Sequence, residues 1–184
     1  MVKVLNNNIT PTGKVIWVTG LSGSGKTTVA ELIYKKVILK NSNYVLLDGD
    51  KLREILLDEN VPKSYELNSR VSLGLKYAKL CKLISDQNIN VIISTISLYK
   101  DVFKYLDENI LNHYKIYLNF SSEVLKSRNQ KSLYSNFEVG QVSNVVGLDI
   151  VYDIPEADLT ITDEMDGKIE IIVQLIIQKC ELII

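Results

Sequence analysis

The chain has 184 residues, a formal net charge of −1 and a pI near 5.9, a length that suits one α/β domain with a buried core. The near-neutral charge excludes broad electrostatic attraction to nucleic acid or an anionic membrane, so we expect neither as a partner. With no secretion signal, no apolar run near the ~20 residues of a membrane span and only two, distant cysteines, we expect a cytoplasmic protein without disulfides.

The first predicted strand, 15–19, leads into a glycine-rich loop and then a helix. Residues 20–28 read Gly-Leu-Ser-Gly-Ser-Gly-Lys-Thr-Thr and satisfy the phosphate-loop pattern G-x-x-x-x-G-K-S/T. In that pattern backbone N–H groups surround the phosphates, Lys26 places a positive charge between them, and the Thr27 hydroxyl ligates Mg²⁺. The following helix adds its dipole. The pattern predicts a nucleoside triphosphate site; the alternative is a glycine-rich turn without a ligand.

The remaining elements alternate between strands and helices. We predict strands at 44–48, 91–95, 115–120 and 157–162, and helices at 51–58, 65–87, 100–112 and 167–182. Strands that alternate with helices favour an α/β fold, with a parallel sheet of about five strands and helices on both faces. Residues 1–14 are a polar arm with no assigned function, and 15–184 form a single domain. The pattern fails at about 127–150, which we expect to be a lid over bound nucleotide.

Two carboxylates follow the second predicted strand. Asp48 and Asp50 would lie near the phosphate loop, at the carboxyl edge of the sheet. The third strand ends in Ser94-Thr95, where a motor ATPase places the aspartate that holds Mg²⁺, and the Asn/Thr-Lys-x-Asp segment of GTPases is absent. These features favour a small-molecule kinase, in which a carboxylate faces the acceptor hydroxyl. The alternative is that the two aspartates only cap the following helix.

Several segments occur in the order and spacing of adenylylsulfate kinases. They are Gly20–Thr28, Leu47–Arg53, Asn68-x-Arg70, Ala78–Leu80, Ile93–Tyr99, Lys131–Tyr134, Gly147–Asp149 and Ala157–Leu159. The chain therefore resembles that family over about residues 15–162. The resemblance implies a P-loop NTPase-type fold and phosphoryl transfer from ATP, with Mg²⁺, to the ribose 3′-hydroxyl of a nucleotide with a second acidic group on its 5′ side. It also allows a homodimer, since family members are often dimers.

The resemblance implies roles on the ATP side. The nucleotide-binding residues would be Gly20, Ser22, Gly23, Ser24, Gly25, Lys26, Thr27, Thr28 and the lid arginine, Arg128. Asp50 would orient the acceptor hydroxyl and finally deprotonate it, while Asp48 and Thr27 would lie on the metal side. Since the proton leaves late in a loose transition state, position matters more than a shifted pKa. Ser94 aligns with a serine suspected of transient phosphorylation; the alternative is a supporting hydrogen bond.

The resemblance also implies an acceptor site. Arg53 would bind the 5′ anion of the acceptor, and the Asn68 amide would recognise the same group. Arg70 would support the pocket or, alternatively, form a surface ion pair. The other acceptor-side residues would be Tyr65, Ile96, Ser97, Lys131, Ser132, Leu133 and Val145.

The acceptor site departs from the family at two aromatic positions. One phenylalanine that stacks on the adenine is replaced near Asn60 or Val61, and the aromatic residue on the other face corresponds to Val145. Losing both stacking contacts would weaken adenine binding by roughly 2–5 kcal/mol. Ser64-Tyr65 also replace an Asp-Arg pair, which implies a less demanding 5′ group. We therefore expect a pyrimidine acceptor, placed beside Tyr65 or the valines.

Cytidine diphosphoramidate kinases, which are relatives of the adenylylsulfate kinases, fit this profile, and the chain resembles them. The resemblance implies phosphorylation of cytidine diphosphoramidate on its ribose 3′-hydroxyl, with release of ADP, during biosynthesis of bacterial capsules. One alternative is an adenylylsulfate kinase of sulfate assimilation with a divergent pocket. Another is a nucleotide-binding module without catalysis, against which the intact Lys26, Thr27, Asp50 and Arg128 argue.

Overall fold

The computed structural model describes residues 12–56, 66–128 and 132–184. Its elements are β1 (Val15–Gly20), α1 (Lys26–Ile38), β2 (Tyr44–Asp48), α2 (Gly49–Leu56), α3 (Leu67–Ser85), β3 (Asn90–Thr95), α4 (Lys100–Asn109), β4 (His113–Leu118), α5 (Ser122–Arg128), α6 (Leu133–Glu138), β5 (Leu159–Ile161), η2 (Asp163–Met165) and α7 (Ile169–Lys179). All pairings in the five-stranded sheet are parallel, in the order β2-β3-β1-β4-β5. The predicted α/β fold is confirmed. No described helix is long and apolar enough to cross a membrane.

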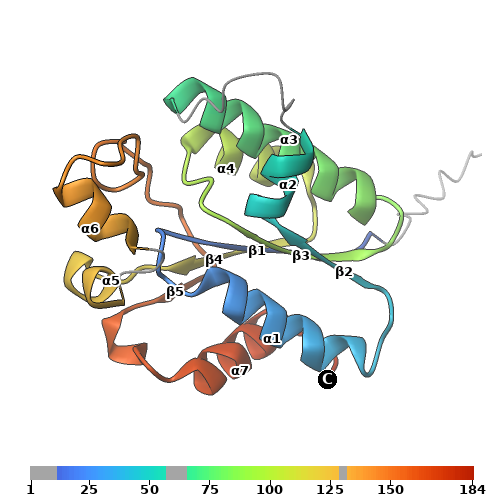
Figure 1. Cartoon of the computed structure of the whole chain (residues 1–184). Helices are drawn as coiled ribbons and strands as arrows, with labels where there is room; N and C mark the ends of the chain where they lie inside the picture. Colours follow the sequence, from blue (N-terminus) through green and yellow to red (C-terminus); the bar gives the residue numbers. More distant parts are fainter. Residues whose placement is uncertain (1–11, 57–65, 129–131) are drawn as a thin grey trace, which may run out of the picture.

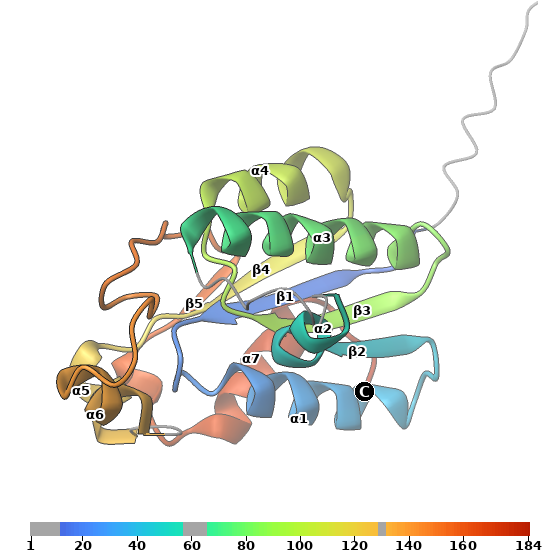
Figure 2. The same cartoon turned by 45° about the horizontal axis from the view of Figure 1, so that its top comes forward.

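Helices cover both faces of the sheet. The helices α2, α3 and α4 lie on one face, and α1 and α7 lie on the other (Figures 1 and 2). The central strand β1 is apolar without interruption because both of its faces are buried. Ile16 and Val18 pack in the core on the α1 and α7 side, whereas Val15 and Trp17 pack in the core beneath α3 and α4.

The connections that follow the neighbouring strands β1 and β3 run to opposite faces of the sheet. Because β1 lies between β3 and β4, the helix after β1 covers one face and the helix after β3 covers the other. Such a divergence opens a crevice beyond the carboxyl ends of the strands, where open parallel sheets bind their ligands. The strand register pairs Thr19 with Thr95 and Asp48 with Ser94. The phosphate loop and the polar ends of β2 and β3 therefore meet at one edge.

Two short helices and a loop stand at the same edge of the sheet. The helices are α5 and α6, and the loop is 139–150 (Figure 1). The sequence pattern did not predict α6, which lies inside the 127–150 stretch. Its buried residue is Tyr134, and one buried position in a six-residue helix leaves no amphipathic pattern to detect.

Candidate active site

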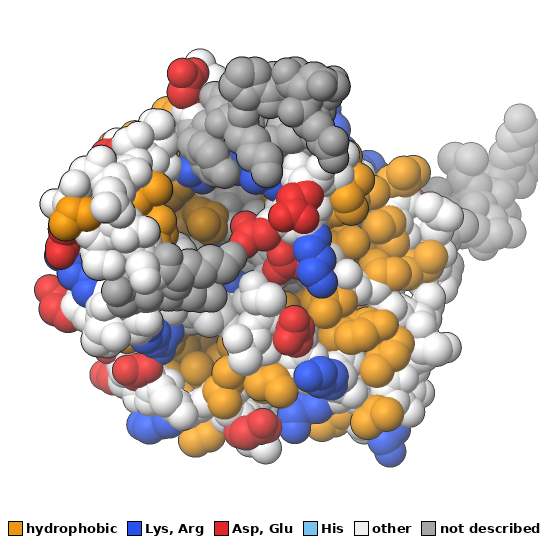
Figure 3. Space-filling view, in the orientation of Figure 1, with side chains coloured by type: hydrophobic (Ala, Val, Ile, Leu, Met, Phe, Trp, Pro, Cys, Tyr) orange, Lys and Arg blue, Asp and Glu red, His pale blue; other side chains and the backbone are white. Residues whose placement is uncertain are grey.

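A cavity of about 680 Å³ lies at the carboxyl edge of the sheet. Figure 3 shows acidic side chains beside the hollow. Of the residues predicted for the site, the cavity is lined by Ser22, Gly23, Gly25, Lys26, Thr27, Thr28, Asp48, Asp50, Arg53, Arg70, Ser94, Ile96, Ser97, Leu133 and Val145. The residues predicted for the two substrates thus share one cavity.

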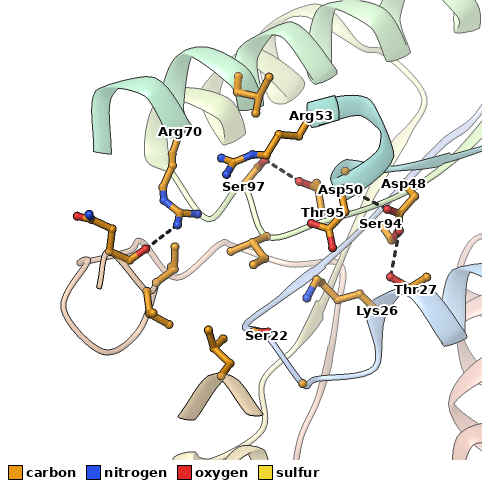
Figure 4. A pocket seen from close by; sticks show the side chains of 18 of the residues that line it. Ser22, Lys26, Thr27, Asp48, Asp50, Arg53, Arg70, Ser94, Thr95 and Ser97 are labelled. Carbon is orange, nitrogen blue, oxygen red and sulfur yellow. Dashed lines mark hydrogen bonds between the residues drawn. The ribbon is translucent and has the colours of Figure 1, made fainter. Parts of the chain in front are cut away.

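The phosphate loop connects β1 to α1 and opens into the cavity. Gly23 and Gly25 have φ angles of 84° and 90°, in the left-handed region that favours glycine. Successive backbone N–H groups in such turns converge on anions. The N-cap residue of α1 is Gly25, which has no side chain to cap the helix, so the first N–H groups of α1 suit an anionic ligand. Lys26 extends into the cavity, and its Nζ donates to the Leu21 carbonyl at 2.9 Å (Figure 4).

Asp48 connects three elements at the site. Its Oδ2 accepts hydrogen bonds from the hydroxyls of Thr27 at 3.0 Å and Ser94 at 2.8 Å, and its Oδ1 accepts from the backbone N–H groups of Asp50 at 3.0 Å and Lys51 at 3.3 Å. Partial burial alone would raise the pKa of Asp48, but these hydrogen bonds outweigh it and lower the pKa. One oxygen therefore caps α2, as the alternative interpretation predicted, while the other faces the phosphate loop (Figure 4).

Thr27 Oγ1 and Asp48 Oδ2 are the candidate protein ligands for a magnesium ion. Mg²⁺ prefers hard oxygen donors, and kinases usually supply only one or two of them because phosphate oxygens and water complete the shell. A hydroxyl and an ionised carboxylate 3.0 Å apart fit this requirement. The residues present therefore suit the metal that the phosphate-loop pattern implies.

Helix α2 carries two charged side chains to the cavity. Asp50 and Arg53 lie three positions apart, on one face of the helix, and both point into the cavity (Figure 4). A hydrogen bond joins the start of α2 to α3, because the Tyr77 hydroxyl donates to the Gly49 carbonyl at 2.8 Å. Burial raises the pKa of Tyr77 to about 12, so the hydroxyl keeps its proton at neutral pH. Because Gly49 precedes Asp50, this hydrogen bond helps to position Asp50.

Arg70 joins α3 to the loop on the opposite wall of the cavity. Its Nη2 donates to the Asn144 carbonyl at 2.6 Å (Figure 4). The Asp149 carboxylate holds the same turn, because it accepts from the backbone N–H of Asn144 at 2.7 Å and from that of Val145. Arg70 therefore lines the cavity and contacts the loop on its opposite wall.

Five predicted site residues do not line the cavity: Gly20, Ser24, Asn68, Arg128 and Ser132. Asn68 is exposed on the first turn of α3. Arg128 contacts the outside of the phosphate loop, where its Nη1 donates to the Gly23 carbonyl at 2.9 Å. Tyr65 and Lys131 lie outside the described residues, as do the Asn60, Val61 and Ser64 positions of the divergent segment.

The cavity also contains residues that the sequence did not predict for it: Gly49, Leu73, Tyr77, Thr95, Tyr99, Gln141, Val142, Ser143, Asn144 and Val146. Tyr77 and Tyr99 are both buried, and both line the cavity. Helical spacing could have predicted two of these residues, because Leu73 and Tyr77 follow Arg70 by three and seven positions and so share its face of α3.

Comparisons with known proteins agree with this site. The adenylylsulphate kinase family model matches residues 12–162. The chain is 42% identical over 168 residues to the cytidine diphosphoramidate kinase of Campylobacter jejuni, covering 91% of this chain and 96% of that protein. It is 31% identical over 144 residues to an adenylyl-sulfate kinase of Buchnera aphidicola, covering 77% and 67%.

Solved structures give the same result. An APS kinase of Mycobacterium tuberculosis, in complex with AMPPNP and APS, matches with a TM-score of 0.78 at 26% identity, covering 93% of this chain and 99% of that one. The family model spans most of the chain, and the matched residues include the phosphate loop and both carboxylates. The chain is thus a kinase that belongs to the adenylylsulfate kinase family.

Proposed function

We propose that this kinase transfers the γ-phosphoryl group of ATP to the ribose 3′-hydroxyl of cytidine diphosphoramidate. The observation that carries the proposal is the 42% identity to the Campylobacter jejuni cytidine diphosphoramidate kinase, over 91% of the chain. The match to the Buchnera adenylyl-sulfate kinase is 31% over 77%. The products would be 3′-phospho-cytidine diphosphoramidate and ADP, and the proposed setting is capsule biosynthesis in the cytoplasm.

The wall of the cavity formed by Val145 and Val146, called here the acceptor wall, supports a pyrimidine acceptor. Val145 and Val146 line it and are 7% and 5% exposed. Stacking a base on an aromatic ring contributes about 1–3 kcal/mol, and an aliphatic side chain offers no π face. A purine, with its larger π surface, loses more by this replacement than cytosine does. An acceptor with a small base therefore suits this wall better than adenine.

The ATP side would bind the β- and γ-phosphates. The backbone N–H groups of the phosphate loop and the Lys26 ammonium would surround the phosphate oxygens. Thr27 and Asp48 would hold Mg²⁺, which when bound offsets the negative charge of the phosphates. Ser94 would keep the Asp48 carboxylate ionised and oriented through its hydrogen bond.

The acceptor side would position the attacking oxygen. Asp50 would accept a hydrogen bond from the 3′-hydroxyl and orient it in line with the γ-phosphorus. A bond forms between O3′ and this phosphorus while the bond from the phosphorus to the β–γ bridging oxygen breaks, which leaves ADP. The proton of O3′ then passes to Asp50, late in the reaction. Arg53 would offset the charge on the 5′ diphosphoramidate.

The test identifies the product as well as turnover. The purified protein is incubated with ATP, Mg²⁺ and cytidine diphosphoramidate; ADP is followed in a coupled assay, and the new phosphate is located by phosphorus NMR. We expect one 3′-phosphate for each ADP released. A phosphate on another oxygen, or no ADP release above the rate without acceptor, would contradict the proposal.

A second candidate acceptor is adenylylsulfate, which the family model and the similarity to the Buchnera adenylyl-sulfate kinase favour. It uses the same ATP side and the same carboxylate, so only the acceptor distinguishes the two functions. Either function requires catalysis, and a module that binds nucleotide without turnover would release no ADP with either acceptor. A homodimer remains a prediction.

A further inference from the structure

Two carbonyl groups of the phosphate loop are bound from outside the cavity, by side chains of α5 and α6. The Tyr134 hydroxyl donates to the Ser22 carbonyl at 3.0 Å, and Arg128 Nη1 donates to the Gly23 carbonyl at 2.9 Å. Each donor lies more than one hundred positions along the chain from its acceptor, since the separations are 112 and 105 residues. Neither donor lines the cavity.

Holding these carbonyls has a consequence for the inner side of the loop. In a trans peptide the C=O and N–H groups point in opposite directions. A donor that holds the Ser22 carbonyl outward therefore turns the Gly23 N–H toward the inside of the loop. Gly23 has a left-handed backbone with φ 84°, the geometry that makes neighbouring N–H groups converge on an anion. The outer hydrogen bond thus favours the phosphate-binding conformation.

Both donors are themselves held in place. The Tyr134 side chain is buried, with 5% exposure, and its ring packs beside Gly23 and Leu125. The Arg128 guanidinium pairs with Asp166 and lies 4.3 Å from the centre of the Phe120 ring. A loop rich in glycine loses much conformational freedom when it becomes ordered, so contacts that order it before the ligand arrives strengthen binding.

We propose that Tyr134 is a positioning residue, which together with Arg128 holds the phosphate loop in its nucleotide-binding conformation. Tyr134 acts through the Ser22 carbonyl and makes no contact with the substrate. The inference rests on the proposed use of ATP. It assigns to α6 a role on the ATP side in addition to the contact of Leu133 with the cavity.

The test is Tyr134→Phe, which removes the hydroxyl and keeps the ring against Gly23. The dissociation constant of ADP with Mg²⁺ is measured by calorimetry for the wild type and the variant. Loss of one hydrogen bond predicts ADP binding roughly three- to tenfold weaker. We expect the KM for ATP to rise by a similar factor and the KM for the acceptor to change less than about twofold. Tyr44→Phe is the matched control, because Tyr44 is a buried tyrosine at the end of β2 away from Asp48 and the cavity. This variant should bind ADP like the wild type.

The outcomes separate this inference from the proposed function. If the wild type binds ADP and Tyr134→Phe binds it equally well, the inference is overturned and the proposed function stands. An equal loss in Tyr44→Phe would also overturn it, because the effect would not belong to the loop contact. A wild type that does not bind ADP contradicts the proposed use of ATP and the inference together. Melting temperatures of both variants show whether a weaker affinity reflects lost folding; if it does, the positioning role is wrong.

Discussion

The two sides of the cavity are built in different ways. On the ATP side, Asp48 and Ser94 lie at the carboxyl ends of β2 and β3, and Thr27 lies in the first turn of α1. Hydrogen bonds of 2.8 to 3.0 Å connect their side chains. On the acceptor side, the Arg70 contact to the Asn144 carbonyl joins segments 74 positions apart. The residues of the ATP side that face the cavity are thus placed by a local motif and by strand register, although Tyr134 and Arg128 support the loop from far along the chain. The acceptor side is made from helices and a loop that only the complete fold brings together.

This difference explains how one side can change without the other. The acceptor wall contributes valine side chains from a loop, and replacing them leaves the hydrogen bonds around Asp48 untouched. Any change to Asp48 or Ser94 would disturb a partner on a neighbouring strand. A family with this architecture can therefore keep its phosphoryl-transfer residues while its acceptor changes.

The largest expected effect comes from the residue at which the two sides meet. Asp50→Asn keeps the shape of the side chain but removes the carboxylate that would accept the acceptor proton. We expect kcat to fall by about a hundredfold or more, with little change in the KM for ATP. Steady-state kinetics measures both. The control is Asp86→Asn at the far end of α3, and turnover of Asp50→Asn within a few-fold of the wild type would show that the carboxylate has another role.

A smaller effect is expected from restoring an aromatic ring to the acceptor wall. Val145→Phe should raise kcat/KM for adenylylsulfate relative to cytidine diphosphoramidate by about tenfold, since one stacking contact contributes about 1–3 kcal/mol. The exposed Val139, which does not line the cavity, supplies the control Val139→Phe. An unchanged ratio in Val145→Phe would refute the stacking argument.

The smallest expected effect concerns the support of Asp48. Ser94→Ala removes a hydrogen bond that lowers the pKa of Asp48, so this pKa should rise toward its ordinary value. Because the ionised carboxylate is the active form, the acid side of the kcat/KM profile should move to higher pH. At neutral pH we expect about a threefold loss of turnover. Turnover lost by more than about a hundredfold would instead favour the phosphorylated serine.

The higher pKa of Asp48 in Ser94→Ala should also change how the stability of the folded protein depends on pH. A lowered carboxylate pKa in the folded state stabilises the protein above the unfolded pKa, and this contribution is lost as the pH falls through the folded value. In the variant this contribution should be smaller, and its loss should be complete at a higher pH. Melting temperatures from neutral to acidic pH check this, and identical curves for variant and wild type would contradict the role of Ser94.

The sequence was sufficient to place most of the phosphate loop together with Asp48 and Ser94 in one cavity, because their positions depend on local order and strand register. Strand, loop and helix follow one another in residues 15–38, and parallel register then places Asp48 beside Ser94. The contacts of Tyr77 and Tyr134 were not predicted, because each depends on how a helix packs against a segment far away in the chain. The helix α6 was missed because it is short, has one buried residue, and is preceded by Ser132 in a left-handed conformation, with φ 55°.

The acceptor site was predicted only in part. Arg53, Arg70 and Val145 line the cavity as expected, but Asn68 is exposed, because its position in α3 is on the side opposite the cavity-lining residues. Positions that we expect to contact the base, such as Tyr65, fall outside the described residues. A resemblance transfers single residues, whereas the shape of a pocket depends on all the segments around it.

The most direct test of the account compares two acceptors on one protein. The values of kcat/KM for cytidine diphosphoramidate and for adenylylsulfate are measured at matched concentrations, together with the KM for ATP in each case. We expect a preference for cytidine diphosphoramidate of at least about tenfold, with the same KM for ATP. A clear preference for adenylylsulfate would contradict the claim that the acceptor wall has changed while the ATP side has not.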